Sequence, residues 1–126
     1  MRVLIVDDQP DVRETIRRQL LPHTTSIDVA DGAETAAALA EASDYDVMLI
    51  DVIMPGEDGV SLIRRLRGRG VTARIVAMSG GSPGRPGLEA LASAAALGAD
   101  AVLFKPFGTA RLLEAVTGGT DAMMPA

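Results

Sequence analysis

The stretch VMLIDVIMPGEDG, residues 47–59, decides the fold, because it sets an apolar run directly against an acid. An apolar run of this length is typical of a strand that is buried on both faces of a parallel sheet. Asp51 closes the run, and the turn residues Pro55 and Gly56 follow only later. The stretch therefore predicts a buried strand with a carboxylate at its carboxyl end, and it does not favour a simple turn aspartate.

Two further segments repeat this arrangement. Residues 2–8 read RVLIVDD and place Asp7 and Asp8 after an apolar run, while residues 101–106 read AVLFKP and place Lys105 after another. The carboxyl ends of parallel neighbouring strands share one edge of a sheet, where open α/β sheets bind their ligands. We therefore expect three carboxylates and an ammonium to meet in one crevice.

Amphipathic and alanine-rich stretches alternate with the apolar runs. We predict strands over residues 2–6, 26–30, 46–50, 73–78 and 101–104, and helices over residues 10–20, 31–42, 60–66, 88–97 and 109–117. Short strands that alternate with helices are typical of an α/β protein with a doubly wound parallel sheet and helices on both faces.

The composition excludes several classes of protein. A chain of 126 residues can build one domain with a core, but not two ordinary ones. The net charge of -5 argues against a nucleic-acid-binding surface, and we expect the clustered arginines to lie on solvated helix faces. The chain has no cysteine, and it shows no signal-peptide or membrane-spanning pattern. We therefore expect a cytoplasmic protein without membrane insertion or direct nucleic-acid binding.

The acids of the expected crevice have a defined chemistry. The carboxylates of Asp7, Asp8 and Asp51 repel one another unless one is protonated or a cation binds. Mg²⁺ suits such a site because it accepts one or two carboxylates and keeps several waters. Asp51 can also act as a nucleophile, since carboxylates form acyl phosphates in phosphoryl transfer. An alternative for Asp7 and Asp8 is that they cap the first helix.

Lys105 and Ser79 extend the same set. A lysine beside buried surface is uncommon unless it is paired, and Pro106 holds the preceding residue extended along the strand direction. Ser79 follows the fourth predicted strand and offers a hydroxyl at the same edge, although serines of this kind are usually loop residues. An acid pair, an acid, a hydroxyl and a lysine at successive strand ends predict a site for a divalent cation and a phosphoryl group.

This joint pattern resembles the receiver domain of response regulators, the CheY-like family of two-component signalling. The resemblance runs from residue 2 to about residue 117, and its matching segments are LIVDD (4–8), LIDVIMPGEDG (49–59), AMSG (77–80), GAD (98–100) and KPF (105–107). It implies a (βα)5 flavodoxin-like fold with strand order 2-1-3-4-5. We expect one receiver domain over residues 1–117, followed by a disordered tail over residues 118–126.

The resemblance implies a role for each acid. Asp51 would accept a phosphoryl group from a phosphohistidine on a sensor histidine kinase or a histidine phosphotransfer protein. Mg²⁺, for which Mn²⁺ can substitute, would be bound by Asp8, Asp51 and the backbone carbonyl of Ile53. Asp7 would act on the ion through a bound water. The protein would catalyse only its own phosphorylation and dephosphorylation, so we do not expect an enzyme with a separate substrate.

The switch is where the sequence departs from the family. Ser79, Gly80 and Lys105 would contact the phosphoryl group, as they do in receivers that resemble this chain. Many receivers also carry an aromatic residue three positions before the lysine, and its rotation reports phosphorylation. That position is Val102 here, which has neither a ring nor a hydroxyl. We expect the Gly- and Pro-rich loop over residues 79–87 to make the larger conformational change.

The predicted partner surface comprises Pro10, Arg13, Leu88, Leu91 and Phe107. Pro10 and Arg13 lie on the first helix, where the resemblance implies contact with the kinase. The face formed by the fourth helix, the fifth strand and the last helix is the expected surface for an output partner or a homodimer. The sequence does not identify the output partner.

Other functions stay open. A receiver-like docking module without phosphorylation is one, although the complete set of acids, hydroxyl and lysine argues against it. A second is a phosphatase with Asp51 as nucleophile, but the general acid that such enzymes carry two positions on is replaced here by Ile53. A nucleotide-binding module is weaker, because no glycine-rich phosphate loop follows the first strand. His23, the only histidine, is a poor candidate for a relay site.

Overall fold

Five parallel strands form one sheet in the order β2-β1-β3-β4-β5. The computed structural model describes residues 1–54, 56–80, 92–95 and 97–118. The strands are β1 (Arg2–Val6), β2 (Ser26–Ala30), β3 (Val47–Asp51), β4 (Arg74–Ser79) and β5 (Ala101–Phe104). The predicted parallel sheet and its strand order are confirmed.

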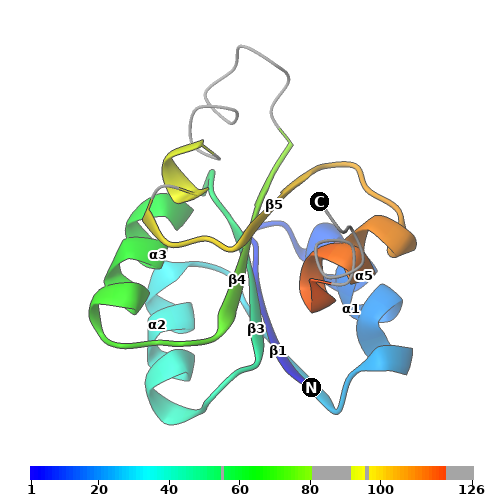
Figure 1. The fold of residues 1–126 in the computed structure, drawn as a ribbon, viewed down its shortest axis with the longest axis horizontal. Helices are drawn as coiled ribbons and strands as arrows, with labels where there is room; N and C mark the ends of the chain where they lie inside the picture. The colour runs from blue at the N-terminus through cyan, green and yellow to red at the C-terminus, as the bar shows by residue number, and fades with distance from the viewer. Residues whose placement is uncertain (55, 81–91, 96, 119–126) are drawn as a thin grey trace.

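Helices cover both faces of this sheet, as Figure 1 shows in an edge-on view. On one side lie α1 (Pro10–Leu20) and α5 (Thr109–Thr117), and on the other lie α2 (Ala33–Ala42) and α3 (Gly59–Gly68). A short 3₁₀ turn, η1 (Leu21–His23), follows α1 and was not predicted. Residues 92–95 are helical within the predicted fourth helix, but Leu88 and Leu91 lie outside the described residues.

The apolar strands fill the core by strict alternation. In β1 and β3, every second residue packs under α1 and α5, and the residues between them pack under α2 and α3. The first set is Val3, Ile5, Val47 and Leu49, and the second is Leu4, Val6, Met48 and Ile50. Each such side chain contributes about 2 kcal/mol when it is fully buried. Because a slip of one residue would exchange the two faces, this burial fixes the register of the strands.

Two strands run one residue later than the sequence predicted. β3 ends at Asp51, which pairs with Met78 of β4, and β4 ends at Ser79, which pairs with Phe104 of β5. At the other end, the backbone N–H of Asp46 donates to the carbonyl of Arg2 at 2.9 Å, before β3 begins. The acid and the hydroxyl are therefore held by the sheet itself.

The connection into β5 is held by Arg67 of α3. We expected this arginine on a solvated helix face, and that expectation is wrong. Its guanidinium donates to the carbonyls of Gly98 (3.0 Å), Val71 (2.9 Å) and Ala73 (2.8 Å), and to the carboxylate of Asp100 (2.8 Å). A Cβ on Gly98 would lie 2.6 Å from Cγ of Arg67, so only glycine leaves room for the arginine. The contact places β5, and with it Lys105.

The last described helix, α5, ends at Thr117, and the C-cap residue Gly118 adopts a left-handed conformation with φ of 69°. Residues 119–126 lie outside the described residues, so the domain boundary and the tail stay predictions. Within the described part of the chain, the structure contains no helix of the length and apolar character that a membrane span requires.

Candidate functional site

Three carboxylates converge at the carboxyl edge of the sheet. Oxygens of Asp7, Asp8 and Asp51 lie within 4.8 Å of one another. Asp7 follows β1 directly and Asp51 ends β3, and these strands are neighbours. Asp7 is fully buried, Asp51 is 6% exposed and Asp8 is less buried than either. The predicted acid cluster is therefore assembled by the strand order.

The strand alternation also explains which way the charged groups point. Each of three residues continues the series of its strand that packs under α1 and α5. The series are Val3-Ile5-Asp7, Val47-Leu49-Asp51 and Ala101-Leu103-Lys105. A period of two places such residues on one face of a sheet, which brings both carboxylates and the ammonium together.

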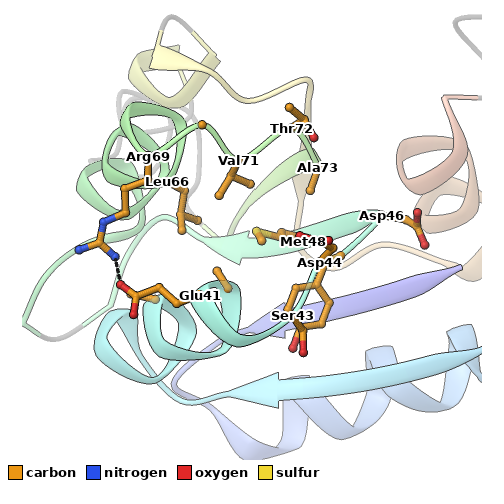
Figure 2. Close-up of a pocket in the computed structure, with 14 residues that line it drawn as sticks. Glu41, Ser43, Asp44, Asp46, Met48, Leu66, Arg69, Val71, Thr72 and Ala73 are labelled. Carbon is orange, nitrogen blue, oxygen red and sulfur yellow. Dashed lines mark hydrogen bonds and ion pairs between the residues drawn. The ribbon is translucent and has the colours of Figure 1, made fainter.

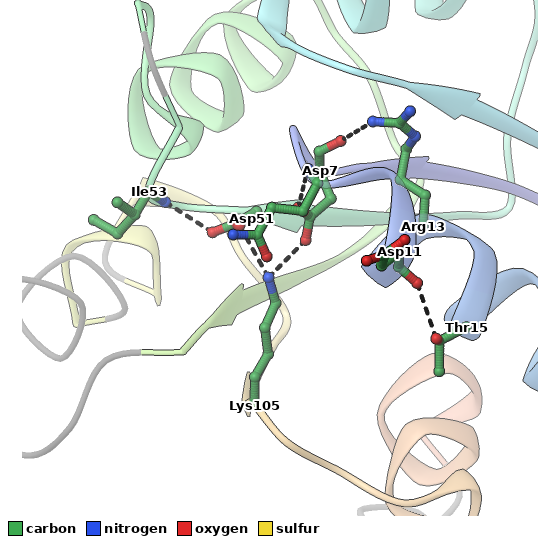
Figure 3. Close-up of polar contacts among 8 residues, drawn as sticks. Asp7, Asp11, Arg13, Thr15, Asp51, Ile53 and Lys105 are labelled. Atoms are coloured by element: carbon green, nitrogen blue, oxygen red, sulfur yellow. Dashed lines mark hydrogen bonds and ion pairs between the residues drawn. The ribbon is translucent and has the colours of Figure 1, made fainter.

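Every polar group of Asp7 has a partner, and Figure 3 shows the contacts with Arg13 and Lys105. Its backbone N–H donates to the carbonyl of Ala30 at 3.1 Å, and its own carbonyl accepts from Nη1 of Arg13 at 2.7 Å. Oδ1 accepts from the backbone N–H of Gln9 at 2.9 Å, and Oδ2 accepts from Nζ of Lys105 at 2.6 Å. A carboxylate held at both oxygens suits the predicted role through a bound water, which stays a prediction.

Asp51 lies between two donors in the same view (Figure 3). Oδ1 accepts from the backbone N–H of Ile53 at 2.9 Å, and Oδ2 accepts from Nζ of Lys105 at 3.0 Å. Burial raises the pKa of Asp51, and these two hydrogen bonds oppose the rise only in part. Burial lowers the pKa of Lys105, but its hydrogen bonds to Asp7 and Asp51 outweigh that effect, so the pKa is raised. The ammonium therefore stays charged beside the acids.

The predicted phosphoryl-binding residues also meet at this edge. Ser79 is 1% exposed, and its carbonyl accepts from the backbone N–H of Lys105 at 2.8 Å. A Cβ on the exposed Gly80 would lie 3.9 Å from Cβ and Cδ of Lys105, which is an ordinary contact. The structure therefore brings Ser79, Gly80 and Lys105 together. The peptide bond between Lys105 and Pro106 is cis.

Gly59 lies at the site and was not predicted from the sequence to have a role there. A Cβ at Gly59 would lie 2.1 Å from the backbone oxygen of Asp51 and 2.6 Å from Cα of Val52. The helix α3 starts here, and the side chain of Asp58 caps it by accepting from the N–H of Ser61 at 2.8 Å. The sequence alone does not reveal this, because a glycine permits a close backbone approach but is also used for turns and caps. Gly59 lets α3 begin against the strand end that carries Asp51.

Of the other predicted residues that the structure describes, Pro10 and Arg13 lie on α1, Val102 lies within β5, and Phe107 follows β5. Pro10 is exposed, whereas Arg13 and Phe107 are only partly exposed. Val102 is 40% exposed. A groove of about 240 Å³ adjoins Lys105, between α1 and the residues that follow β5, and is lined by Asp11, Val12, Thr15, Ile16, Gln19, Lys105, Pro106 and Phe107.

A larger cavity of about 580 Å³ opens at the opposite edge of the sheet, between the ends of α2 and α3 (Figure 2). Met48, Leu66 and Val71 line it, and an ion pair of 2.7 Å between Glu41 and Arg69 lies at its rim. Its described lining includes none of the predicted site residues. This cavity is therefore separate from the site that the sequence predicts.

Comparison with known proteins agrees with this geometry. Residues 3–117 match the family described as "Response regulator receiver domain". The chain is 32% identical over 108 residues to the transcriptional regulatory protein ResD of Bacillus subtilis, covering 84% of this chain and 42% of ResD. It is 33% identical over 113 residues to the response regulator MprA of Mycobacterium tuberculosis, covering 90% of this chain and 47% of MprA. The chain thus spans less than half the length of these relatives.

Solved structures show the same fold. A receiver domain of a Francisella response regulator superposes with a TM-score of 0.78 at 28% identity, covering 96% of this chain and 97% of that one. The response regulator TrrA of Thermotoga maritima, solved in complex with Mg(2+)-BeF, superposes with a TM-score of 0.77 at 29% identity, covering 93% of this chain and 96% of that one. Together with the strand order and the acid cluster, these matches establish that the chain belongs to the receiver domain family of response regulators.

Proposed function

We propose that Asp51 accepts a phosphoryl group from a phosphohistidine of a partner protein, and that this changes which partner the receiver binds. One observation carries the proposal: the Asp51 carboxylate lies between the N–H of Ile53 and the ammonium of Lys105, within reach of two further carboxylates. Phosphoryl transfer depends mainly on positioning and on neutralising the charge of the transferring group. The residues around Asp51 supply both.

The transfer is a substitution at phosphorus. A carboxylate oxygen of Asp51 forms a bond to phosphorus while the bond from phosphorus to the imidazole nitrogen of the donor breaks, and that nitrogen keeps the electron pair. The N–H of Ile53 holds Oδ1 and so limits rotation of the attacking carboxylate. The ammonium of Lys105, 3.0 Å from Oδ2, is placed beside the oxygens of the arriving group.

The residues present fit a magnesium ion. Ligand oxygens at about 2.1 Å from Mg²⁺ lie up to about 4 Å apart, close to the spread within the cluster of Asp7, Asp8 and Asp51. In this proposal Asp8, Asp51 and the carbonyl of Ile53 hold the ion, and Asp7 acts through a water. When bound, Mg²⁺ supplies charge neutralisation for the phosphoryl group.

The donor must approach over the carboxyl edge, because Asp51 is only 6% exposed. The groove between α1 and Phe107 adjoins Lys105. Its apolar lining offers a surface against which a side chain of a sensor kinase or a phosphotransfer protein can pack. Pro10 and Phe107 flank this approach as the proposed contact residues. An output partner and a homodimer through the face of the fourth helix, β5 and α5 follow from the family and remain proposals, as does a cytoplasmic location.

The reaction that we propose acts on the chain itself, so the protein has no separate substrate to turn over. The test is incubation with acetyl phosphate, a small phosphodonor, and Mg²⁺, followed by intact-mass measurement. We expect a gain of one phosphoryl group on the wild type and none on Asp51→Asn. Asp58→Asn is the matched control, because asparagine can still cap α3 and the variant should be modified like the wild type.

Each other outcome has a definite meaning. Equal modification of Asp51→Asn and the wild type would remove Asp51 as the acceptor. A wild type that stays unmodified with acetyl phosphate and with phosphohistidine donors would favour the docking module that works without phosphorylation. Release of inorganic phosphate from a generic phosphate ester would instead favour the phosphatase.

A further inference from the structure

We propose that Arg13 is a positioning residue for the metal site: its guanidinium clamps the carbonyl of Asp7 and thereby aims the neighbouring carboxylate of Asp8. This inference rests on the proposed magnesium site and deepens it. From the sequence, Arg13 is predicted only as part of the partner surface. The geometry gives it a contact inside the site (Figure 3).

The clamp closes a loop between β1 and α1. The backbone N–H of Arg13 donates to the carbonyl of Gln9 at 3.1 Å, which belongs to the first turn of α1. From there the side chain reaches back, and Nη1 donates to the carbonyl of Asp7 at 2.7 Å. Arg13 is only partly exposed, and the contact is partly buried. The helix that follows the acid pair therefore holds the acid pair in place.

The clamped group is the one that orients Asp8. The carbonyl of Asp7 and the backbone N–H of Asp8 belong to one planar peptide unit, so a fixed carbonyl fixes the direction in which the chain enters Asp8. The other bonds of Asp7, to Ala30 and Gln9, hold its own N–H and side chain. Among the described contacts, only Arg13 holds the carbonyl of this peptide through a side chain.

Position and charge act in opposite directions on metal affinity. Removing a positive charge near three carboxylates makes the site more negative, which strengthens the binding of a dication. Removing a group that holds a ligand in place weakens binding, commonly by 10- to 100-fold for residues that support metal ligands. The sign of the change in affinity therefore separates a positioning role from a purely electrostatic one.

The experiment is a Mg²⁺ titration of the metal-free chain, followed by the backbone amide signals in NMR. We expect Arg13→Met to weaken Mg²⁺ binding about ten-fold. We expect a smaller loss in Arg13→Lys, which keeps the charge but lacks the planar fork of donors. Arg18→Met is the matched control, because Arg18 lies on the same helix with a side chain 76% exposed and paired with Glu14. It should bind Mg²⁺ like the wild type or slightly more tightly.

A second readout uses the metal-free protein alone. If Arg13 holds the Asp7–Asp8 peptide, the amide of Asp8 should exchange with solvent faster in Arg13→Met than in Arg18→Met. Should Arg13→Met fail to fold, Arg13→Lys decides, since its net charge is that of the wild type. Wild-type affinity in Arg13→Lys, or unchanged or tighter binding in Arg13→Met, would overturn the proposal.

The two proposals can fail separately. A wild type that binds Mg²⁺ but takes no phosphoryl group would remove the proposed function and leave the role of Arg13 intact. A wild type that is modified at Asp51, with Arg13 variants that bind Mg²⁺ as it does, would remove the role of Arg13 alone.

Discussion

Nζ of Lys105 lies 2.6 Å from Oδ2 of Asp7, a residue 98 positions away in the chain, and this contact is shorter than the 3.0 Å contact to Asp51. Asp7 is fully buried, so the ammonium is its main compensating charge. Lys105 therefore has a structural task that precedes any phosphoryl group. It neutralises an acid that the fold has taken out of water.

Replacing Lys105 by methionine should destabilise the fold. Two acids would lose their shared cation, and breaking a buried ion pair in this way costs about 3 kcal/mol. Urea unfolding at neutral pH without metal measures the loss. Adding Asp7→Asn to the variant should restore part of the stability, because it removes the uncompensated charge. If Lys105→Met is as stable as the wild type, the ion pair is not the compensating contact that we describe.

The raised pKa of Asp51 predicts a pH-dependent stability difference. The folded state binds the Asp51 proton more tightly than the unfolded state does, so the resulting stability is present below about pH 4 and is lost as the pH rises through the folded pKa. Asp51→Asn does not titrate at this position. We therefore expect the unfolding free energy of the variant to increase relative to that of the wild type as the pH rises from about 4 to about 7 in the presence of a chelator. A constant difference across that range would contradict the direction of the pKa shift.

Gly59→Ala should disrupt the start of α3. The added methyl would lie 2.1 Å from the backbone oxygen of Asp51, and a strand inside the sheet cannot yield cheaply. We expect a loss of about 3 kcal/mol, at the upper end for an overpacked site. Gly68→Ala is the control: it lies in the same helix and its Cβ would meet nothing within 4 Å. That variant should match or slightly exceed the wild type in thermal unfolding, because alanine favours helix over glycine.

Tyr45, the only tyrosine of the chain, should lose its phenol proton at a higher pH than an ordinary tyrosine does. Burial, together with a 2.5 Å hydrogen bond to Asp28, raises its pKa to about 12. The neutral phenol therefore contributes stability below its ordinary pKa of 10.0, and this is lost as the pH rises through about 12. Ultraviolet absorbance of the tyrosinate gives the midpoint without interference. Asp28→Asn should lower the midpoint, and an unchanged value would exclude Asp28 as a cause.

The sequence predicted the residues of the acid site better than the residues that hold the site in place. Apolar runs that end in Asp7, Asp51 and Lys105 indicate both the parallel sheet and the meeting of these groups, because strand ends are fixed by the same burial that forms the strands. Arg13 and Arg67 could not be assigned in this way. Each donates mainly to backbone carbonyls. Because every residue has a backbone carbonyl, the sequence does not show which carbonyl will accept from an arginine. Only the tertiary packing distinguishes such an arginine from one on a solvated helix face.

The alternation in β3 makes the site more sensitive to chain length than to residue identity. β3 is paired with β4 along its whole length and with β1 from Val47 to Ile50, and Asp51 shares a face with Val47 and Leu49. An insertion or deletion of one residue within β3 would turn Asp51 toward α2 and α3, away from Lys105, even if every other residue were kept. Among relatives of this chain, we expect β3 to vary freely among apolar residues and to keep its length.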